Sequence, residues 1–319
     1  MALLTRKRVI LVETESSYGT DPTPTGADAL IVSDLSITPQ ASDVVNRDTV
    51  RPYLGASEQL LANTRVECAF SVELAGSGTG GTAPRWGKAL KACGMSETSS
   101  GSGAAGVVTY APVSAAFSSV TIYYMLDGVR HKVTGCRGNA SISAEVGAIP
   151  SLDFAFTGVY VAPDDVALPA VTYGAQATPL VFKNGNSTGF QLLSYAGALQ
   201  SISLDLGNSL VYRELVGGTK EVLLTDRAVT GSVSIEAVTM ATKNFFTAAL
   251  TDSTLGNLQF THGTGSSGSA NGNTIKVSST RIDIGDVSYG EQDGIAMLEI
   301  PYTAIPSTAG NNEFSIVQY

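Results

Sequence analysis

The side chains that most often carry catalysis are scarce in this sequence. Only two histidines are present, His131 and His262, and neither has a carboxylate or nucleophile pattern beside it. A structural or surface role is therefore expected for both. The Gly-rich stretches lack the Lys-Ser/Thr ending that holds phosphate. Asp164 and Asp165 lack the alternating carboxylates of a calcium loop. We expect no enzyme activity, no cofactor and no metal site.

The cysteines indicate a reduced interior. Cys68, Cys93 and Cys136 are an odd number without CxxC spacing, which disfavours zinc ligation or a disulfide framework. Buried thiols and assembly in a cytoplasm are expected instead. The opening MALLTRKRVILVETESS has no small-residue cleavage site, so a signal peptide is not expected. No run of eighteen apolar residues occurs, and membrane insertion is not expected either.

The composition favours sheets joined by turns. The 319 residues are 43% hydrophobic but only 15% charged, and 34 of them are glycine. Helical proteins usually carry more Glu and Lys on their exposed faces. The net charge of −9 disfavours a surface that holds nucleic acid, because the phosphates are also negative. The same charge suits a surface past which nucleic acid must move freely.

One strand-like segment occurs twice in the chain. Aligned without a gap, Glu58–Glu73 and Glu221–Glu236 share six of sixteen residues, where unrelated segments would share roughly one. The identical pairs are Glu58/Glu221, Leu60/Leu223, Leu61/Leu224, Val66/Val229, Ser71/Ser234 and Glu73/Glu236. Further matches set Gly128, Lys132, Val133 and Arg137 opposite Gly272, Lys276, Val277 and Arg281, and Phe154 and Phe156 opposite Leu298 and Ile300. We infer an internal duplication of about 150 residues.

The duplication predicts a mainly β chain with two tandem domains, each carrying one short helix. We place the first domain in residues 1–161, a Pro-containing linker in residues 162–188, and the second domain in residues 189–319. The run RWGKALKACG, which follows Pro84, is the expected helix of the first domain, and Thr242–Leu250 is that of the second.

The repeated strand has one apolar and one polar face. From Thr64 to Leu74 apolar and polar residues alternate, as in an antiparallel strand with one wet side. The tight-turn pair Asp127 and Gly128 predicts a β-hairpin further on. Before the repeated strand, Val44–Asn63 is a long excursion between strands. Loops of that length inside a compact domain are usually functional, often as contact arms.

Taken together, these features resemble a known family. The paired strands, the long arm, the helix starting near RWGKAL and the closing hairpin resemble the tube domain of major tail proteins of long-tailed, non-contractile bacteriophages. The opening run RKRVILVETESSYGTDPTPTGADALIV is similar to the start of tail tube proteins of temperate siphophages. The resemblance extends over essentially the whole chain.

The resemblance implies a fold and an assembly. Each tube domain is expected to be a β-sandwich or barrel, and neighbouring subunits are expected to join strands into a ring around a lumen. Stacked rings form the virion tail tube, assembled in the host cytoplasm, through which DNA passes without specific binding. Members with a duplicated domain resemble trimers that imitate sixfold symmetry, so trimeric rings are expected. The implied partners are a tail terminator, a tape measure and distal tail proteins.

Two sets of residues receive roles from this resemblance. Acidic residues opposite the apolar strand faces are expected to face the lumen, where like charge keeps DNA from binding. They are Glu67, Glu73, Asp153, Glu236 and Glu299. The segments Val44–Asn63 and Asn208–Val222 are expected to contact stacked rings. Their candidate residues are Arg47, Arg51, Tyr53, Tyr212 and Arg213. Each set keeps a plainer alternative, in which the side chains face solvent.

Other classes of β protein remain as alternatives. A capsid decoration or baseplate subunit would share the composition, and growth into long tubes would distinguish the two. A secreted pilin or adhesin should carry a signal peptide and often paired cysteines. A transmembrane β-barrel, faintly suggested by the aromatic segment Glu313–Tyr319, also needs export and places apolar residues outward.

Overall fold

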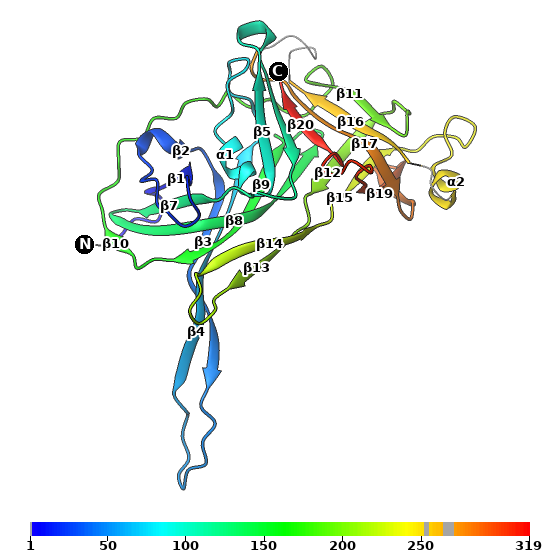
Figure 1. Cartoon of the computed structure of the whole chain (residues 1–319). Coiled ribbons are helices and arrows are strands. Elements are labelled where there is room, and N and C mark those ends of the chain that lie inside the picture. Colours follow the sequence, from blue (N-terminus) through cyan, green and yellow to red (C-terminus); the bar gives the residue numbers. More distant parts are fainter. Residues whose placement is uncertain (1, 252–254, 264–270) are drawn as a thin grey trace.

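The computed structural model describes residues 2–251, 255–263 and 271–319, and it confirms a mainly β chain (Figure 1). The first strands are β1 (Arg8–Thr14), β2 (Ala29–Leu30), β3 (Ser33–Asn46), β4 (Gln59–Glu73), β5 (Met95–Ser100), β6 (Val107–Pro112), β7 (Val120–Leu126), β8 (Val129–Glu145), β9 (Ser151–Tyr160) and β10 (Asp164–Asp165). The later strands are β11 (Ser187–Leu192), β12 (Leu199–Asp205), β13 (Asn208–Arg213), β14 (Glu221–Arg227), β15 (Thr230–Glu236), β16 (Gly256–His262), β17 (Ile275–Ile284), β18 (Ser288–Gln292), β19 (Ile295–Ala304) and β20 (Ser315–Gln318).

Helices are short and few in the described ranges. The two α-helices are α1 (Gly87–Lys91) and α2 (Phe245–Leu250), and single 3-10 turns cover Gly26–Asp28 and Gly103–Ala105. One helix therefore lies in each predicted domain. No described helix has both the length and the apolar composition needed to cross a membrane.

One antiparallel sheet runs through both halves of the chain. Its strand order is β3-β4-β9-β8-β12-β15-β19-β18. We call it the long sheet. The halves meet where β8 pairs with β12, with Ile142 opposite Leu204. Both of these side chains are buried, so the junction contributes to the core.

The remaining strands close the core on the other side. In the first half β2, β1 and β7 continue from β8, and in the second half β11, β16 and β17 form a similar group. The C-terminal strand β20 pairs with β17 and also with β6, where Ile316 lies opposite Tyr110. One hydrophobic cluster contains residues of both halves. The halves therefore pack as one body, and the predicted domain limits stay a prediction.

The two halves repeat one order of strand pairing. It runs β3-β4-β9-β8-β7-β1 in the first half and β12-β15-β19-β17-β16-β11 in the second. The same hydrogen bond recurs at equivalent places. Ser71 donates to Asp153 at 2.5 Å, and Ser234 donates to Glu299 at 2.6 Å. Because Ser71 and Ser234 are also aligned in the repeated segment, the strand register agrees with that part of the alignment.

The later part of the sequence alignment is off by two residues. The strand register sets Phe154 opposite Phe70 in β4, and Ile300 opposite the corresponding Val233 in β15. Phe154 therefore corresponds to Ile300, not to Leu298. Loop lengths and β-bulges differ between the halves, and an alignment by spacing alone does not count them.

Two local predictions are confirmed in the first half. Asp127 and Gly128 form the two-residue turn between β7 and β8, with φ of 40° and 104°. Positive φ at both positions is what a tight hairpin turn requires, and glycine meets it without strain. The run after Pro84 forms α1, and the buried indole N–H of Trp86 donates to the Ala75 carbonyl at 2.8 Å.

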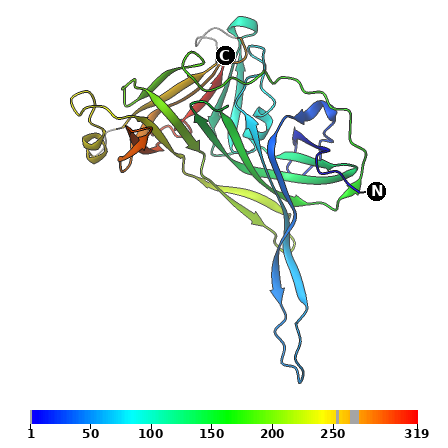
Figure 2. The ribbon, with the colours of Figure 1, turned by 180° about the vertical axis from the view of Figure 1, so that it is seen from behind.

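Two β-hairpins project from the body, as the two opposite views show (Figures 1 and 2). Of the segment Val44–Asn63, expected to be an excursion between strands, residues 47–58 lie outside strands, whereas β3 extends to Asn46 and β4 begins at Gln59. The second hairpin is β13–β14, which forms its own two-stranded sheet. The strand residues 44–46 and 59–63 were not predicted, because strands exposed on both faces do not show the alternation that reveals a half-buried strand.

The segment predicted to be a linker lies along the first half. Backbone N–H groups of Val166, Thr172 and Ala177 donate to carbonyls of that half at 2.9, 2.9 and 2.7 Å. All three cysteines are buried free thiols, as predicted. The linker role itself is not tested by these contacts.

Candidate functional site: an acidic sheet face and two projecting hairpins

One face of the long sheet is polar across both halves. In each strand buried apolar residues alternate with residues that turn to the opposite side, as in Ile202 and Leu204 against Ser203. Directly opposed residues of paired strands point to the same side of a sheet. The register therefore assembles the polar residues of seven strands, from β4 to β19 and including part of β18, into one surface. We call this surface the polar face.

All five acidic residues singled out from the sequence lie on the polar face. They are Glu67 and Glu73 in β4, Asp153 in β9, Glu236 in β15 and Glu299 in β19. Glu67 and Glu236 are exposed, whereas the other three are half-buried. The structure thus brings together carboxylates that are up to 232 residues apart in the chain, the separation of Glu67 and Glu299 (299 − 67).

Two further carboxylates on this face were missed. Glu145 follows buried Ala144 in β8, and Asp205 follows buried Leu204 in β12. Asn139 donates to Asp205 at 2.7 Å, which fixes that carboxylate at the junction of the halves. A strand containing Glu145 was predicted. The alternation of apolar and polar residues in that strand was the signal that could have placed Glu145 on the polar face.

The cations on the polar face are engaged within the chain. Arg137 of β8 lies opposite Thr157 in β9, and its half-buried guanidinium donates to the carbonyls of Val222 and Phe117 at 2.7 and 3.1 Å. Arg65 is the cation at the described polar-face positions of β4, and its guanidinium contacts Glu67 at 3.1 Å and Asp43 at 3.4 Å. The amide of Asn63, which donates to Asp43 at 2.8 Å, and the Arg65 guanidinium hold the pKa of Asp43 below its usual range. Neighbouring strands lie about 4.8 Å apart, so the unpaired carboxylates act together. The face therefore presents negative charge to anything beside it.

The first hairpin, β3–β4, carries three of the predicted arm residues near its tip. Arg47 contacts Glu58 at 3.3 Å, and both side chains are exposed. Arg51 donates to Ser57 at 3.0 Å and lies 5.9 Å from the ring of Tyr53. These contacts shape the tip within the hairpin. Tyr53 itself is 65% exposed.

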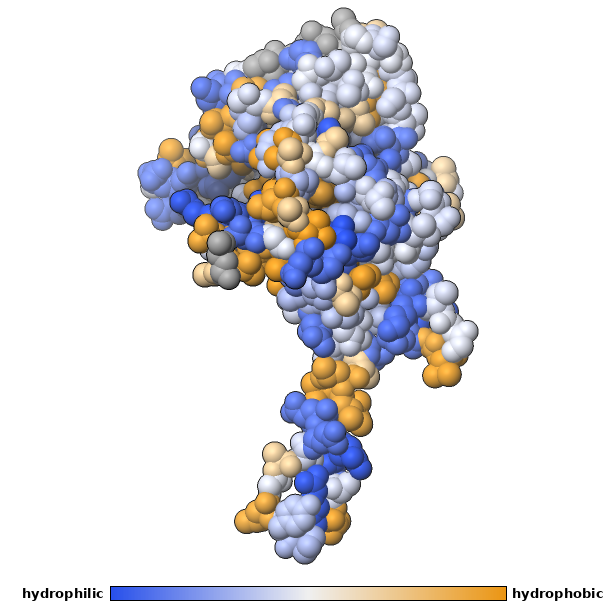
Figure 3. All heavy atoms as spheres, turned by 90° about the vertical axis from the view of Figure 1, so that its left-hand side faces the viewer, coloured by the Kyte–Doolittle hydropathy of each residue, from blue (hydrophilic) through white to orange (hydrophobic). Residues whose placement is uncertain are grey.

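Apolar side chains are also exposed along this hairpin. Val50 and Leu54 are fully exposed at the tip, and Val44, Val45, Leu60 and Leu61 are about half exposed on its strands. Figure 3 shows hydrophobic patches on the projecting hairpin, separated by polar atoms. A two-stranded hairpin has no core of its own. Apolar residues in such a position mark a surface that another molecule covers.

The second hairpin contacts the first. Tyr212 donates to the carbonyl of Thr64 in β4 at 3.1 Å, and burial raises the pKa of Tyr212 to about 12. Arg213 contacts Glu221 across the hairpin at 3.3 Å. Tyr212 is therefore engaged within the chain. Among the exposed apolar residues of this hairpin, Leu215 and Val216 lie at its tip and Val211 lies on β13.

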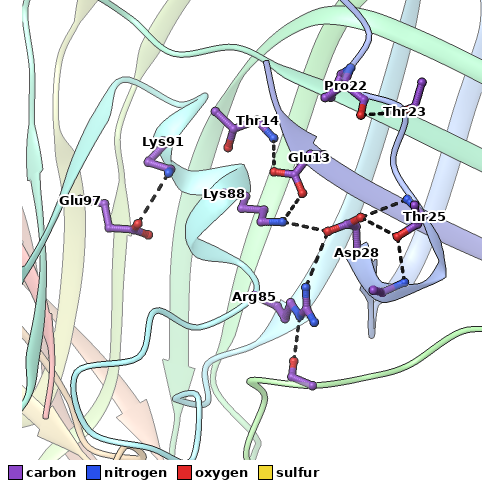
Figure 4. A network of polar contacts seen from close by, with 12 residues as sticks. Glu13, Thr14, Pro22, Thr23, Thr25, Asp28, Arg85, Lys88, Lys91 and Glu97 are labelled. Carbon is purple, nitrogen blue, oxygen red and sulfur yellow. Dashed lines mark hydrogen bonds and ion pairs between the residues drawn. The ribbon is translucent and has the colours of Figure 1, made fainter. Parts of the chain in front are cut away.

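A second charged cluster lies away from the polar face and is structural (Figure 4). Lys88 of α1 contacts both Glu13 of β1 and Asp28, the latter at 3.0 Å. Burial opposes ionisation of Asp28, but the surrounding hydrogen bonds and the Lys88 ammonium outweigh it, so the pKa of Asp28 lies well below its usual range. Arg85 donates to the carbonyl of Gly174 at 3.0 Å. The cluster fastens α1 to the first strand and to the linker.

The two histidines have no catalytic geometry. His262 is buried, its Nδ1 lies 2.9 Å from the Ser187 hydroxyl, and its Nε2 lies 3.2 Å from the Leu180 carbonyl. A carbonyl only accepts, so Nε2 carries the proton and donates. Burial lowers the pKa of His262 and of His131. His262 is a neutral link between β16 and the preceding segment.

Comparison with known proteins adds one match. A family model described as phage tail tube protein matches residues 5–304. No curated protein matches the chain.

Proposed function

This chain belongs to the phage tail tube protein family and is a structural component of the virion tail, and we propose that it polymerises into stacked rings whose lumen conducts DNA into the host. The observation that carries the proposal is the long sheet. It exposes an acidic face over its whole width while both of its end strands have an unpaired edge among the described residues. Open edges are templates for pairing with another chain.

The acidic face is proposed to line the lumen. Glu67, Glu73, Asp153, Glu236 and Glu299 share it with Glu145 and Asp205. Duplex DNA carries one phosphate charge per about 1.7 Å of its axis, so a wall of carboxylates repels it at every step. Repulsion at the wall keeps the passing genome from binding, and it needs no sequence contacts.

The proposed ring is a trimer. The repeated order of strand pairing and the recurring Ser-carboxylate hydrogen bond support an internal duplication, with domains in residues 1–161 and 189–319 and a linker between them. Two tube domains per chain would let three chains imitate sixfold symmetry. The siphovirus-type, non-contractile tail belongs to the same proposal.

The hairpins are proposed to contact the neighbouring ring. Val50, Tyr53 and Leu54 are exposed in the connection between β3 and β4, which also contains Arg47 and Arg51. Covering this apolar tip stabilises the stack by removing it from water. Arg213 lies on the second hairpin, whereas Tyr212 is proposed to hold that hairpin in place.

The remaining roles follow from a tail tube. Its partners would be further copies of the chain, a tail terminator, a tape measure and distal tail proteins, and assembly would take place in the host cytoplasm. A structural family supports a protein without enzyme activity or cofactor.

Electron microscopy of the purified full chain at high concentration tests the proposal. Hollow tubes are expected, grown spontaneously or from added tail tips. A chain that decorates capsids or baseplates and gives no tubes under either condition would overturn it.

A further inference from the structure

The long sheet ends in two strands that each have one unpaired edge. The sheet begins with β3, which pairs with β4 alone, and it ends with β18, which pairs with β19 alone, within the described residues. Residues Asp34–Thr38 on β3 are exposed or half-buried, and Ser288–Gln292 on β18 are too. Neither edge has a second strand partner among the described residues, although the Leu35 carbonyl on β3 accepts from the Arg8 guanidinium.

The junction between β8 and β12 shows how two such strand edges pair within the same chain. Inside the sheet β8 and β12 are antiparallel neighbours that belong to different halves. Their register sets Ser201 opposite Glu145, Ser203 opposite Ser143 and Asp205 opposite Ser141. No loop joins these two strands directly, because β9, β10 and β11 lie between them in sequence. The junction is therefore held by strand pairing and core packing.

The strand register makes β3 the equivalent of β12. Ile37 lies opposite Cys68 in β4, and Leu204 lies opposite Gly231 in β15. Cys68 and Gly231 are aligned in the repeated segment, so Ile37 corresponds to Leu204. The apolar alternation agrees, because Leu35 and Ile37 are half-buried as Ile202 and Leu204 are buried.

By the same reasoning β18 is the equivalent of the end of β8. Ser141 lies opposite Asp153 in β9, and Ser288 lies opposite Glu299 in β19. Asp153 and Glu299 are the equivalent acceptors of the recurring hydrogen bond. Residues Ser141–Glu145 thus correspond to Ser288–Gln292. The first set is covered by β12, whereas the second set is uncovered in the single chain.

We propose that β18 of one copy pairs antiparallel with β3 of the next copy, in the register of the internal β8–β12 junction. The proposal rests on the ring assembly proposed above and names its interface. The predicted opposing pairs are Gly290/Ser36, Tyr289/Ile37 and Ser288/Thr38, obtained by transferring the internal register. A β-bulge between Ser33 and Ser36 interrupts the register of β3 beyond these pairs, where Glu291 and Gln292 would lie beside it. Each copy gives one edge and receives one, so the contact is head-to-tail and generates a ring.

The side chains fit this register on both faces. On the core side Tyr289, which is 63% exposed in the single chain, would lie opposite Ile37. Ile37 would then cover Tyr289 as Leu204 covers Ile142 at the internal junction. Glu291 would lie beside the bulged residue Leu35, whose carbonyl accepts from the exposed guanidinium of Arg8 at 3.0 Å. Opposite charges therefore meet at the interface.

The polar side also continues without a break. It would carry Ser36, Thr38 and Ser288, where the internal junction has Ser203, Asp205 and Ser141. No cation is introduced at these positions. The acidic face thus passes from one copy to the next.

Cysteine pairing across the interface tests the register. Thr38→Cys with Ser288→Cys puts two thiols on directly opposed residues, whose Cα atoms lie about 4.5 to 5.5 Å apart in antiparallel strands, within disulfide range. Thr38→Cys with Gln292→Cys is the matched control, displaced by four residues, or about 13 Å. The native cysteines stay silent, because burial raises the pKa of the Cys68 thiol to about 12 and those of Cys93 and Cys136 well above their usual value.

Oxidised tubes of the opposed pair should give covalent multimers on a non-reducing gel, and reduction should return them to single chains. The displaced pair should stay monomeric. Tubes that form normally but crosslink only in the displaced pair, or in neither, would overturn the interface and leave the tube function standing. If the unmodified chain never forms tubes, the proposed function fails first.

If the cysteine variants do not assemble, amide hydrogen exchange of the unmodified chain tests the same interface. Amides of residues 34–38 and 288–292 should exchange at least about tenfold more slowly in tubes than in single chains. Residues 141–145 and 201–205, already paired, serve as the internal reference. Unchanged exchange of the two edges on assembly would contradict the proposal.

Discussion

Three carboxylates on the polar face are positioned by neutral hydroxyl and amide donors. Ser71 holds Asp153, Ser234 holds Glu299, and Asn139 holds Asp205. These neutral donors fix the carboxylates without cancelling their charge. A lysine or arginine in their place would position the same carboxylates but neutralise their charge. A neutral face would not repel DNA.

One buried ion pair should carry much more stability than an exposed one. Arg227 and Glu313 are 10% and 5% exposed, and Arg227 also donates to the Val113 carbonyl at 2.8 Å. Arg227→Met leaves Glu313 buried without its partner, so the free energy of unfolding should fall by about 3 to 5 kcal/mol. Arg213→Met removes a partner of Glu221 that is itself 50% exposed, and should cost under about 1 kcal/mol. Denaturant titration of the unassembled chain measures both, and equal losses would contradict the assignment.

The free energy of unfolding should fall at low pH, because Asp21 then becomes protonated. Burial opposes its ionisation, but hydrogen bonds from Lys132 and Tyr123 outweigh it and hold the pKa of Asp21 below its usual 3.8. A carboxyl with a depressed folded pKa stabilises above its unfolded pKa and loses that contribution as pH falls through the folded pKa. The difference in unfolding free energy between the parent and Lys132→Met should therefore be largest above about pH 4 and shrink at lower pH.

The matched control for this effect is Lys220→Met, whose pair with Glu214 is more exposed. Denaturant titrations at several pH values from 6 to about 2 give the comparison. A difference between parent and Lys132→Met that stays constant over this range would show that Asp21 does not act through its charge.

At the scale of elements, the strands with one buried face could be predicted and the exposed ones could not. Alternation in β4 and the Asp127–Gly128 turn gave strand, face and hairpin correctly, because burial of one side imposes a period of two. The projecting part of β3–β4 is exposed on both sides, so nothing in its pattern distinguishes it from a loop. The junction of β8 with β12 also had no local signal, since pairing between halves depends on the whole fold.

The projecting hairpin should matter to assembly and not to folding. Val50→Ser with Leu54→Ser removes the apolar tip, which contacts no core residue, so the unfolding free energy should change by less than about 0.5 kcal/mol. Tube length or yield should fall, because the covered apolar area is lost. Deleting Tyr53–Ser57 should act in the same direction and more strongly.

Electron microscopy and denaturant titration of the same preparations separate the two effects. Leu215→Ser at the tip of the second hairpin is the matched control for loss of an exposed apolar residue. Normal tubes from the Val50 and Leu54 variant would remove the first hairpin from the contact between rings.

At the scale of the whole molecule, the long sheet unites the acidic face, the open edges and the repeat. Replacing Glu73 and Glu236 with Lys reverses charge at two places on the polar face without touching the core side. Tubes should remain intact, while genome delivery should slow because DNA then meets cations. Asp165→Lys, in the short strand β10 outside this face, is the control for reversal of an exposed charge. Delivery timed by DNA release from complete virions gives the result, and unchanged release would place the carboxylates away from the lumen.

The central claim is a ring in which three copies continue one sheet, and the symmetry of assembled tubes tests it most directly. Cryo-electron microscopy of tubes, with the chains in each ring counted from the reconstructed map, is the measurement. Three chains per ring, joined from β18 of one copy to β3 of the next, is the expected result. Six chains per ring, or a sheet that stops at the edge of each copy, would contradict it.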